Sequence, residues 1–177
     1  MNAMTEIVIE DSRWGALDLA GLVRDATART LAHLGIEAEE PELSLLACDD
    51  ARIAVLNADF RGKPVPTNVL SWPAEERGAE IPGGRPDTPQ PGHDGSIELG
   101  DIALAYETCL KEAQAGRLTF EAHVTHLLVH GVLHLLGYDH EEDADAVLME
   151  GLESEILGKM GIDDPYRSNT AEQDPPE

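Results

Sequence analysis

The chain lacks the features that mark membrane-spanning, secreted and thiolate-metal proteins. It contains no apolar run of about 20 residues, the length that a membrane-spanning helix needs. Its first residues lack the basic and apolar regions of a secretory signal. Only two cysteines are present, Cys48 and Cys109, and their separation matches no metal-binding spacing. We therefore expect a cytoplasmic protein without membrane association, whose two cysteines are reduced and buried.

Positive charge is also scarce. The chain has 12 lysines and arginines against 35 aspartates and glutamates, which gives a formal net charge of −23 at pH 7. This balance disfavours nonspecific nucleic-acid binding, because such binding uses cations to neutralise phosphates. Arg52, Arg61 and Lys63 lie close in sequence and could form a local basic spot. The acidity could also suit a basic protein partner.

Many of the acidic residues fall in the last third of the chain. We expect most of them to lie on a solvated helix face or in a frayed tail, without a specific role. Those before the tail are Glu141, Glu142, Asp143, Asp145, Glu150, Glu153 and Glu155.

Length and composition indicate one globular domain. With 177 residues and 42% hydrophobic content, the chain can build a single core. We place that domain at 1–166 and expect 167–177 to form a disordered acidic tail. The segment 74–96 is rich in glycine, proline and acids and has no periodicity, so we expect a flexible loop inserted in the domain.

Apolar periodicity and turn residues predict the order of strands and helices. Strands are expected at 6–10, 42–48, 67–72 and 99–105, and helices at 17–34, 49–60, 106–115, 119–136 and 144–157. Because strands and helices do not alternate strictly, the pattern favours an α+β fold with a small mixed sheet packed with helices. The helix at 119–136 is apolar on several sides, which predicts a central position.

Three histidines in and after that helix have the spacing of a metal site. They are arranged as His130-x-x-x-His134-x-x-Gly137-x-x-His140. His130 and His134 lie one helical turn apart, so both imidazoles can reach one ion. Gly137 can adopt the positive φ that ends a helix and turns the chain back, which brings His140 to the same ion. Three imidazoles around an open position are typical of a catalytic Zn²⁺ site, although nickel or another transition ion could also bind.

The same spacing occurs in the zinc helix of the metzincin peptidases. Those enzymes carry a glutamate directly after the first histidine, and it acts as the general base. Here Gly131 occupies that position and cannot accept a proton. Glu141 and Glu142 lie beyond the turn, where we expect them to be solvated, so the peptidase interpretation lacks its base.

Three blocks of the sequence resemble, in the same order, the YbeY family of metal-dependent endoribonucleases. Residues 56–73 are similar to the family's arginine-containing loop and the strand after it, 99–102 to its next strand, and 126–140 to its metal block. The ending at 161–166 also resembles the family's. The resemblance spans most of the chain from Leu45 to Tyr166. It departs from the family at Trp72, where phenylalanine is usual, and in the long 74–96 loop.

This resemblance implies a single-strand-specific, metal-dependent endoribonuclease that processes ribosomal RNA. It points to maturation of the 3′ end of small-subunit ribosomal RNA and to ribosome quality control. The implied substrate is a ribosomal RNA precursor, and the implied partners are ribosomal proteins or an assembly GTPase. The family fold places a small mixed sheet beside a central metal-bearing helix.

The resemblance also assigns roles to individual residues. His130, His134 and His140 would hold the metal, and His134 and Arg61 are the catalytic candidates. A metal that activates water would need no separate strong base, which agrees with Gly131. Arg61 could pair two phosphate oxygens and stabilise the charge that develops on the phosphoryl group.

Two other functions stay open at this point. One is a metzincin-like metallopeptidase, and the other is a non-catalytic ribosome-assembly factor with a structural metal site. A structural zinc usually has four protein ligands, whereas the sequence offers three obvious ones. Two neighbours also have open roles. His126 could support the site or donate to a backbone carbonyl, and Asp139 could orient a ligand or shape the turn.

Overall fold

The computed structural model describes residues 4–37, 40–75, 83–84, 86, 96–139 and 142–162. The elements are β1 (Met4–Ile9), the 3-10 helix η1 (Ser12–Ala16), α1 (Leu19–His33), β2 (Glu40–Cys48), α2 (Asp50–Arg61), β3 (Val69–Pro73), β4 (Ser96–Ala105), α3 (Tyr106–Ala115), α4 (Phe120–Leu135) and α5 (Asp143–Lys159). Every strand and helix expected from the sequence is present. The expected tail lies outside the described residues, as does most of the expected 74–96 loop.

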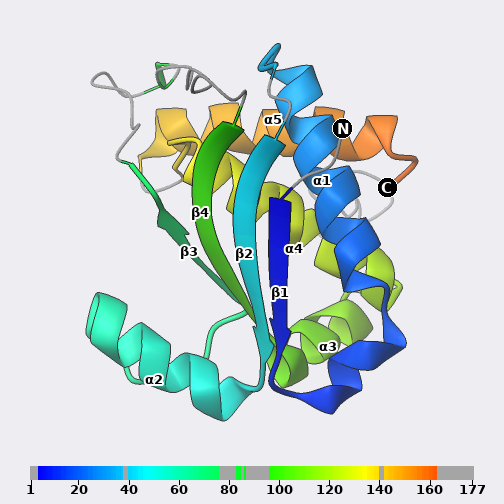
Figure 1. Ribbon diagram of the computed structural model, residues 1–177, viewed down its shortest axis with the longest axis vertical. Helices are drawn as coiled ribbons and strands as arrows, with labels where there is room; N and C mark the ends of the chain where they lie inside the picture. The colour runs from blue at the N-terminus through cyan, green and yellow to red at the C-terminus, as the bar shows by residue number, and fades with distance from the viewer. Residues whose placement is uncertain are drawn as a thin grey trace, which may run out of the picture.

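The four strands form one mixed sheet in the order β1-β2-β4-β3. β1, β2 and β4 run parallel, and β3 runs antiparallel to β4 at the edge of the sheet (Figure 1). The fold is therefore α+β, as the sequence predicts.

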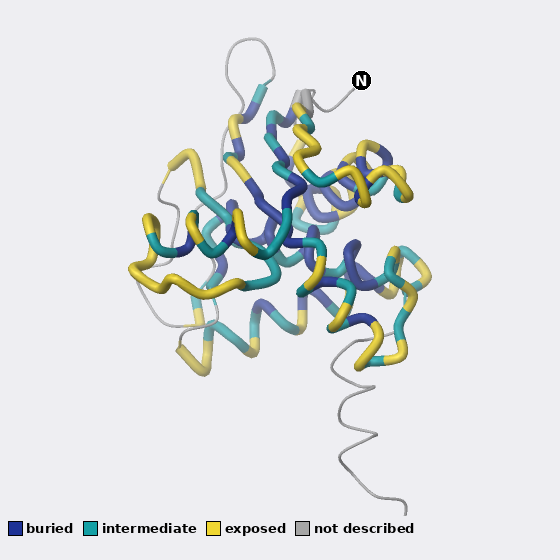
Figure 2. The backbone as a smooth tube through the Cα atoms, turned by 90° about the horizontal axis from the view of Figure 1, so that it is seen from below, coloured by how far each residue is buried: buried dark blue, intermediate teal, exposed yellow. Residues whose placement is uncertain are grey.

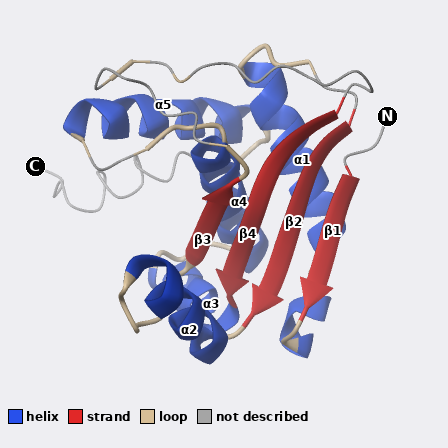
Figure 3. Ribbon diagram, turned by 60° about the vertical axis from the view of Figure 1, so that its left-hand side comes forward, coloured by secondary structure: helices blue, strands red, loops and turns tan. Residues whose placement is uncertain are grey.

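The two faces of the sheet are covered unequally. α1 and α4 pack on one face, and α5 packs against α4 on the side away from the strands (Figure 1). The main core lies there, and the buried segments gather where the helices meet the sheet (Figure 2). Among the described elements, α2 alone packs on the opposite face, at one end (Figure 3), over a small cluster that includes Ile53 and Leu70. Away from α2, described side chains on this second face, such as Glu6, Glu98 and Asp101, are exposed, and we call it the open face.

α4 is the central helix, and its two ends follow the sequence prediction. The Thr119 hydroxyl accepts a hydrogen bond from the backbone N–H of Ala122 at 3.1 Å, which caps the first turn. At the other end Gly137 has a φ of 105°, a conformation that favours glycine. The Tyr138 N–H then bonds to the Leu133 carbonyl at 3.0 Å, which closes the helix and turns the chain.

β4 begins earlier than the sequence predicts, at Ser96, because a bulge hides its alternation. The pairing with β2 shifts between Glu42 and Leu43, so that Leu99 is an extra residue in β4. Gly100 follows with a φ of 139°, and a Cβ there would overlap the Trp72 carbonyl oxygen. Ser96, which the sequence places in the expected loop, is therefore part of β4.

Both cysteines are buried and free, as expected. Burial is the main cause that raises the pKa of the Cys48 thiol to about 12. Such a thiol stays protonated at neutral pH, so it is a core residue and not a nucleophile.

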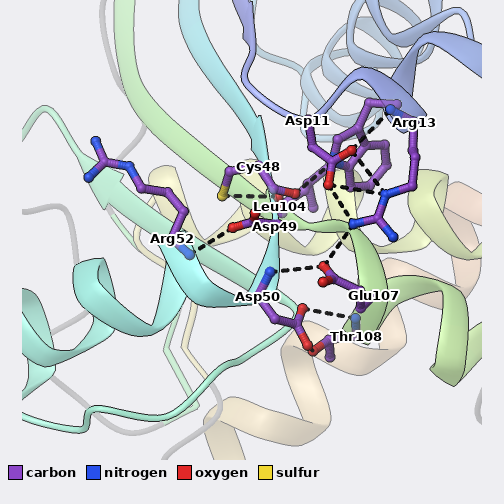
Figure 4. A network of polar contacts seen from close by, with 10 residues as sticks. Asp11, Arg13, Cys48, Asp49, Asp50, Arg52, Leu104, Glu107 and Thr108 are labelled. Atoms are coloured by element: carbon purple, nitrogen blue, oxygen red, sulfur yellow. Dashed lines mark hydrogen bonds and ion pairs between the residues drawn. The ribbon is translucent and has the colours of Figure 1, made fainter.

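The helices α2 and α3 cap each other at one end of the sheet (Figure 4). α3 has no side-chain cap of its own. The Asp50 carboxylate of α2 instead accepts hydrogen bonds from the N–H and the hydroxyl of Thr108, at 3.0 and 2.8 Å. In return, the Glu107 carboxylate of α3 accepts from the Asp50 N–H at 3.0 Å. This exchange fixes the start of α2, the helix that ends at Arg61.

We expect Asp50→Ala to lower the free energy of unfolding by about 1–2 kcal/mol, the usual cost of a lost helix cap. Chemical denaturation monitored by circular dichroism measures this. Asp59→Ala, an exposed position on the same helix, is the control and should change stability by less than about 0.5 kcal/mol. Equal stability of the two variants would contradict the capping role.

Candidate metal centre

The structure brings together two of the three expected metal ligands. His130 and His134 lie one turn apart on α4, with ring centroids 5.3 Å apart and rings inclined by 74°. Their side chains are 19% and 30% exposed, so an ion could reach them from solvent. Two imidazoles on one tetrahedral ion, with metal–nitrogen bonds of about 2.0–2.1 Å, have centroids about 5 Å apart. The observed spacing fits that arrangement.

The third expected ligand, His140, lies outside the described residues. Across the part of the chain that the structure describes, no group of three or more histidine, cysteine, aspartate or glutamate side chains is arranged to hold a metal. The three-histidine set therefore stays a prediction, for which the described residues supply two members.

Behind the two histidines lies a buried carboxylate that the sequence analysis did not assign to the site. Glu153 of α5 is 0% exposed. Its Oε2 lies 2.7 Å from Nδ1 of His130, and its Oε1 lies 2.8 Å from Nε2 of His126. Our expectation that Glu153 is part of a solvated face was wrong.

A signal for this burial was present in the sequence. Residues 149, 152, 153, 156 and 157 follow the spacing of one helix face. The other four positions on that face are apolar and buried: Met149, Leu152, Ile156 and Leu157. Glu153 therefore occupies a core position of α5.

The environment of Glu153 keeps it ionised. Burial by itself raises the pKa of Glu153. The hydrogen bonds from His126 and His130 outweigh this effect and bring the pKa down to about 2. An ionised carboxylate only accepts hydrogen bonds, so Nδ1 of His130 carries the hydrogen. A metal bound by His130 would therefore be held by Nε2, as in other carboxylate-supported histidine ligands.

A second histidine–carboxylate contact supports α4 further from the candidate ligands. Nε2 of His123 lies 2.9 Å from Oε1 of Glu112 on α3. The same carboxylate accepts hydrogen bonds from the side-chain amide of Asn68, at 3.0 and 3.2 Å. Although burial raises the pKa of Glu112, the hydrogen bonds from His123 and Asn68 leave the pKa below its ordinary value of 4.5. This contact ties α4 to α3 and to the start of β3.

Gly131 lies where α4 packs closely against the sheet. A Cβ at this position would be 2.8 Å from Cδ1 of Ile102 and 3.4 Å from the Ser71 hydroxyl oxygen. The position after His130 therefore faces the strands and not the open side of the histidines. A glutamate here could not serve as the base of a peptidase, because its side chain would be directed into the core.

The other expected site residues are less closely tied to the histidine pair. Nε2 of His134 lies 3.9 Å from a carboxylate oxygen of Asp139, which is an ion-pair distance and not a hydrogen bond. Arg61 is exposed and is the last residue of α2. The left-handed Gly62, whose φ is 71°, ends that helix, and the buried Asn57 amide bonds to the Val65 carbonyl at 2.9 Å. Arg61 thus lies on a fixed helix end, on an element separate from α4.

The open face of the sheet has an acidic groove. Its lining includes Trp72 and Ser44 together with the carboxylates of Glu6, Glu42, Glu98 and Asp101. These residues alternate along the strands with the buried ones that face α4, so the groove lies on the face opposite the histidines.

Comparisons with known proteins identify relatives over nearly the whole chain. The family described as endoribonuclease YbeY matches residues 8–161. An endoribonuclease YbeY of Ruegeria pomeroyi is 58% identical over 161 residues, which cover 91% of this chain and 96% of that protein. Another, of Cereibacter sphaeroides, is 55% identical over 94% of this chain and 100% of its own length.

The fold also resembles that of a Thermotoga maritima protein whose structure was solved in solution. That chain is 23% identical, has a TM-score of 0.51, and the match covers 98% of this chain and 99% of that one. Among the described residues, no helix is long and apolar enough to span a membrane.

We expect Gly131→Glu to lower the free energy of unfolding by more than about 3 kcal/mol, because it directs a carboxylate into the packed contact with Ile102. Gly151→Glu is the control, since Gly151 is an exposed α5 residue with nothing near its Cβ position. It should change stability by less than about 1 kcal/mol. Denaturant unfolding of both variants measures the difference, and a Gly131→Glu variant as stable as the control would refute the close packing.

The lowered pKa of Glu112 predicts a pH window for its contribution to stability. A carboxyl whose folded pKa lies below its unfolded value stabilises the fold above the unfolded pKa, near 4.5, and loses this effect as the pH falls further. Wild type should therefore be more stable than Glu112→Gln at about pH 7, and the difference should shrink at about pH 3.5. Denaturant unfolding at both values tests this. A difference that is constant or grows on acidification would contradict it.

Proposed function

The chain belongs to the endoribonuclease YbeY family, and we propose that it cleaves single-stranded ribosomal RNA at a metal centre on α4. It is an RNA-cleaving hydrolase of ribosomal RNA processing, and its substrate is a small-subunit precursor cut near the 3′ end. The same activity serves ribosome quality control. The observation that carries the assignment of the site is the pair of His130 and His134 on one open face of α4, supported from behind by Glu153.

We propose that His130, His134 and His140 hold one transition-metal ion. The spacing of the first two rings and the hydrogen bond on Nδ1 of His130 support this set, and three imidazoles favour Zn²⁺, with nickel as an alternative. When bound, such an ion supplies Lewis acidity toward a phosphoryl oxygen and lowers the pKa of coordinated water.

The chain's own residues would orient the RNA around this centre. Arg61 presents a guanidinium that can pair two phosphate oxygens and stabilise negative charge on the phosphoryl group. Lys63 follows in the same exposed segment and would contact a neighbouring phosphate. The side chain of His134 is more exposed than that of His130. His134 would hold the ion on the side that the RNA can reach, so it is the catalytic histidine of this proposal.

The two alternative functions are not favoured. A peptidase would need a base beside His130, and Gly131 faces Ile102 instead. A purely structural metal would be expected to have four protein ligands in a closed site, whereas His130 and His134 are both partly exposed.

We also propose that a basic protein recruits this acidic enzyme to its RNA. The net charge of −23 opposes free approach to a polyanion. The groove with Glu6, Glu42, Glu98 and Asp101 is a surface that a basic segment could recognise. A ribosomal protein or an assembly GTPase bound at the small subunit would meet this need. The catalytic unit in this proposal is a single domain, residues 1–166.

The test is cleavage of a precursor small-subunit RNA fragment by metal-loaded wild type, Arg61→Ala and His134→Ala. We expect both variants to lose at least about 100-fold in rate, the scale expected for a lost electrostatic or metal contact. Arg61→Ala should keep its metal, measured by elemental analysis, whereas His134→Ala should lose it. Circular dichroism should show a native fold for both.

The same assay should be run on naked RNA and on the RNA assembled in a small-subunit particle. Faster cleavage in the particle is expected if a bound protein recruits the enzyme, and equal rates would refute recruitment. Equal cleavage by wild type and both variants would refute the assigned site. Cleavage of unstructured peptides in place of RNA would instead favour the peptidase.

A further inference from the structure

We propose that Glu153 is a positioning residue that holds His130 in the Nδ1–H form and so directs its Nε2 toward the metal. This inference rests on the proposed metal centre. It concerns a residue of α5 that has no direct contact with the RNA or the ion.

The position of Glu153 is costly for stability alone. It occupies an apolar stripe of α5 and is wholly buried, where a methionine or leucine would pack without any desolvation of charge. Replacing buried ion pairs by apolar residues is often neutral or stabilising. A carboxylate at this position is therefore better explained by what it does to the histidines than by what it adds to the core.

The geometry of the contact determines which imidazole nitrogen is available. Oε2 of Glu153 accepts from Nδ1 of His130 at 2.7 Å, so that nitrogen cannot bind an ion. Nε2, on the opposite side of the ring, is the ligating atom. A single hydrogen bond thus sets both the tautomer and the rotation of the ring.

His126 holds the carboxylate itself in place. Its Nε2 lies 2.8 Å from Oε1 of Glu153, so both carboxylate oxygens are engaged by imidazoles from successive turns of α4. Glu153 cannot rotate to ligate an ion without giving up one of these contacts. Of the two roles that the sequence left open for His126, the proposal therefore assigns it support of the site, because it fixes the carboxylate of Glu153.

The chain contains a matched control for this proposal. Glu112 makes the same type of contact with His123 on the same helix, but His123 lies two turns before His130 and is no candidate ligand. Replacement of either glutamate by glutamine removes one carboxylate from an imidazole contact. Only Glu153→Gln also disturbs a candidate metal ligand, His130. The oxygen of the new glutamine can accept a hydrogen bond from one imidazole, but its NH₂ group then faces the other.

The experiment is a Zn²⁺ titration of the metal-free, full-length protein against a chromophoric chelator, with no RNA present. We expect Glu153→Gln to weaken Zn²⁺ binding by about 10–100-fold, the usual effect of losing a carboxylate behind a histidine ligand. Glu112→Gln should bind Zn²⁺ within about twofold of wild type. Circular dichroism establishes that each variant is folded. Equal affinities of Glu153→Gln and Glu112→Gln would overturn the proposal.

A second measurement decides the matter even if Glu153→Gln does not fold. Long-range ¹H–¹⁵N NMR of the metal-free wild type reports which nitrogen of each neutral imidazole carries its hydrogen. We expect the Nδ1–H form for His130, and the Nε2–H form would overturn the proposal. Because neither measurement uses RNA, a failure of the ribonuclease assay would leave this result unaffected and would refute the proposed function alone.

Discussion

The rotation of α4 about its own axis decides which of its side chains reach the open side of the molecule. Three neighbouring elements set that rotation. Gly131 allows close contact with Ile102 of β4. Glu153 of α5 contacts His126 and His130 on successive turns of α4, and Glu112 of α3 contacts His123. A rotation by one residue, about 100°, would direct the imidazole of His130 into the sheet. The position of the proposed ligands therefore depends on the packing of Gly131, His126 and His123 as well as on the contact of His130 with Glu153.

The distribution of charge limits how this acidic protein can approach RNA. The carboxylates that line the groove lie on the sheet face opposite α4. Arg61 and Lys63 lie at the exposed end of α2, the helix that packs at one end of that same face. Charges separated by more than about 10 Å are largely screened in 0.1 M salt. Local contacts with individual phosphates can therefore hold RNA, while the net negative charge disfavours nonspecific binding. The proposed recruitment by a basic protein would supply the affinity that the field of the whole protein does not.

Much of the fold could be predicted from the sequence, because its signals are local. The periodic helices and the positive φ of Gly137 follow from rules that use only residues a few positions apart in the chain. The start of β4 could not be placed because the bulge at Leu99 and Gly100 interrupts the alternation that marks a strand. η1 was missed because five residues are too few for a periodic pattern. Its Trp14 is buried by contacts that sequence does not reveal, including a hydrogen bond to the Cys48 carbonyl.

Within the site, the sequence indicated the histidines but not what supports them. The spacing of His130 and His134 is a property of one helix, so it could be recognised without a structure. The contact with Glu153 joins residues that are 23 positions apart on two helices, and composition alone assigned that acid to the surface. The position of Glu153 within the apolar stripe of α5 was the available signal. A charged residue at a core position of an amphipathic helix predicts a buried partner more reliably than it predicts a solvated face.

The location of the glutamate relative to the first histidine separates this centre chemically from a zinc peptidase. In the peptidase motif the glutamate adjoins that histidine in sequence and faces the reacting water. Here the glutamate comes from another helix, faces Nδ1 and has both oxygens engaged by imidazoles. It can orient a ligand, but it cannot remove a proton from water. In the proposed function, a bound metal ion would lower the pKa of water, and Arg61 would stabilise charge on the phosphoryl group. That division of roles suits a phosphodiester, whose reaction places negative charge on the phosphoryl oxygens that a guanidinium can pair.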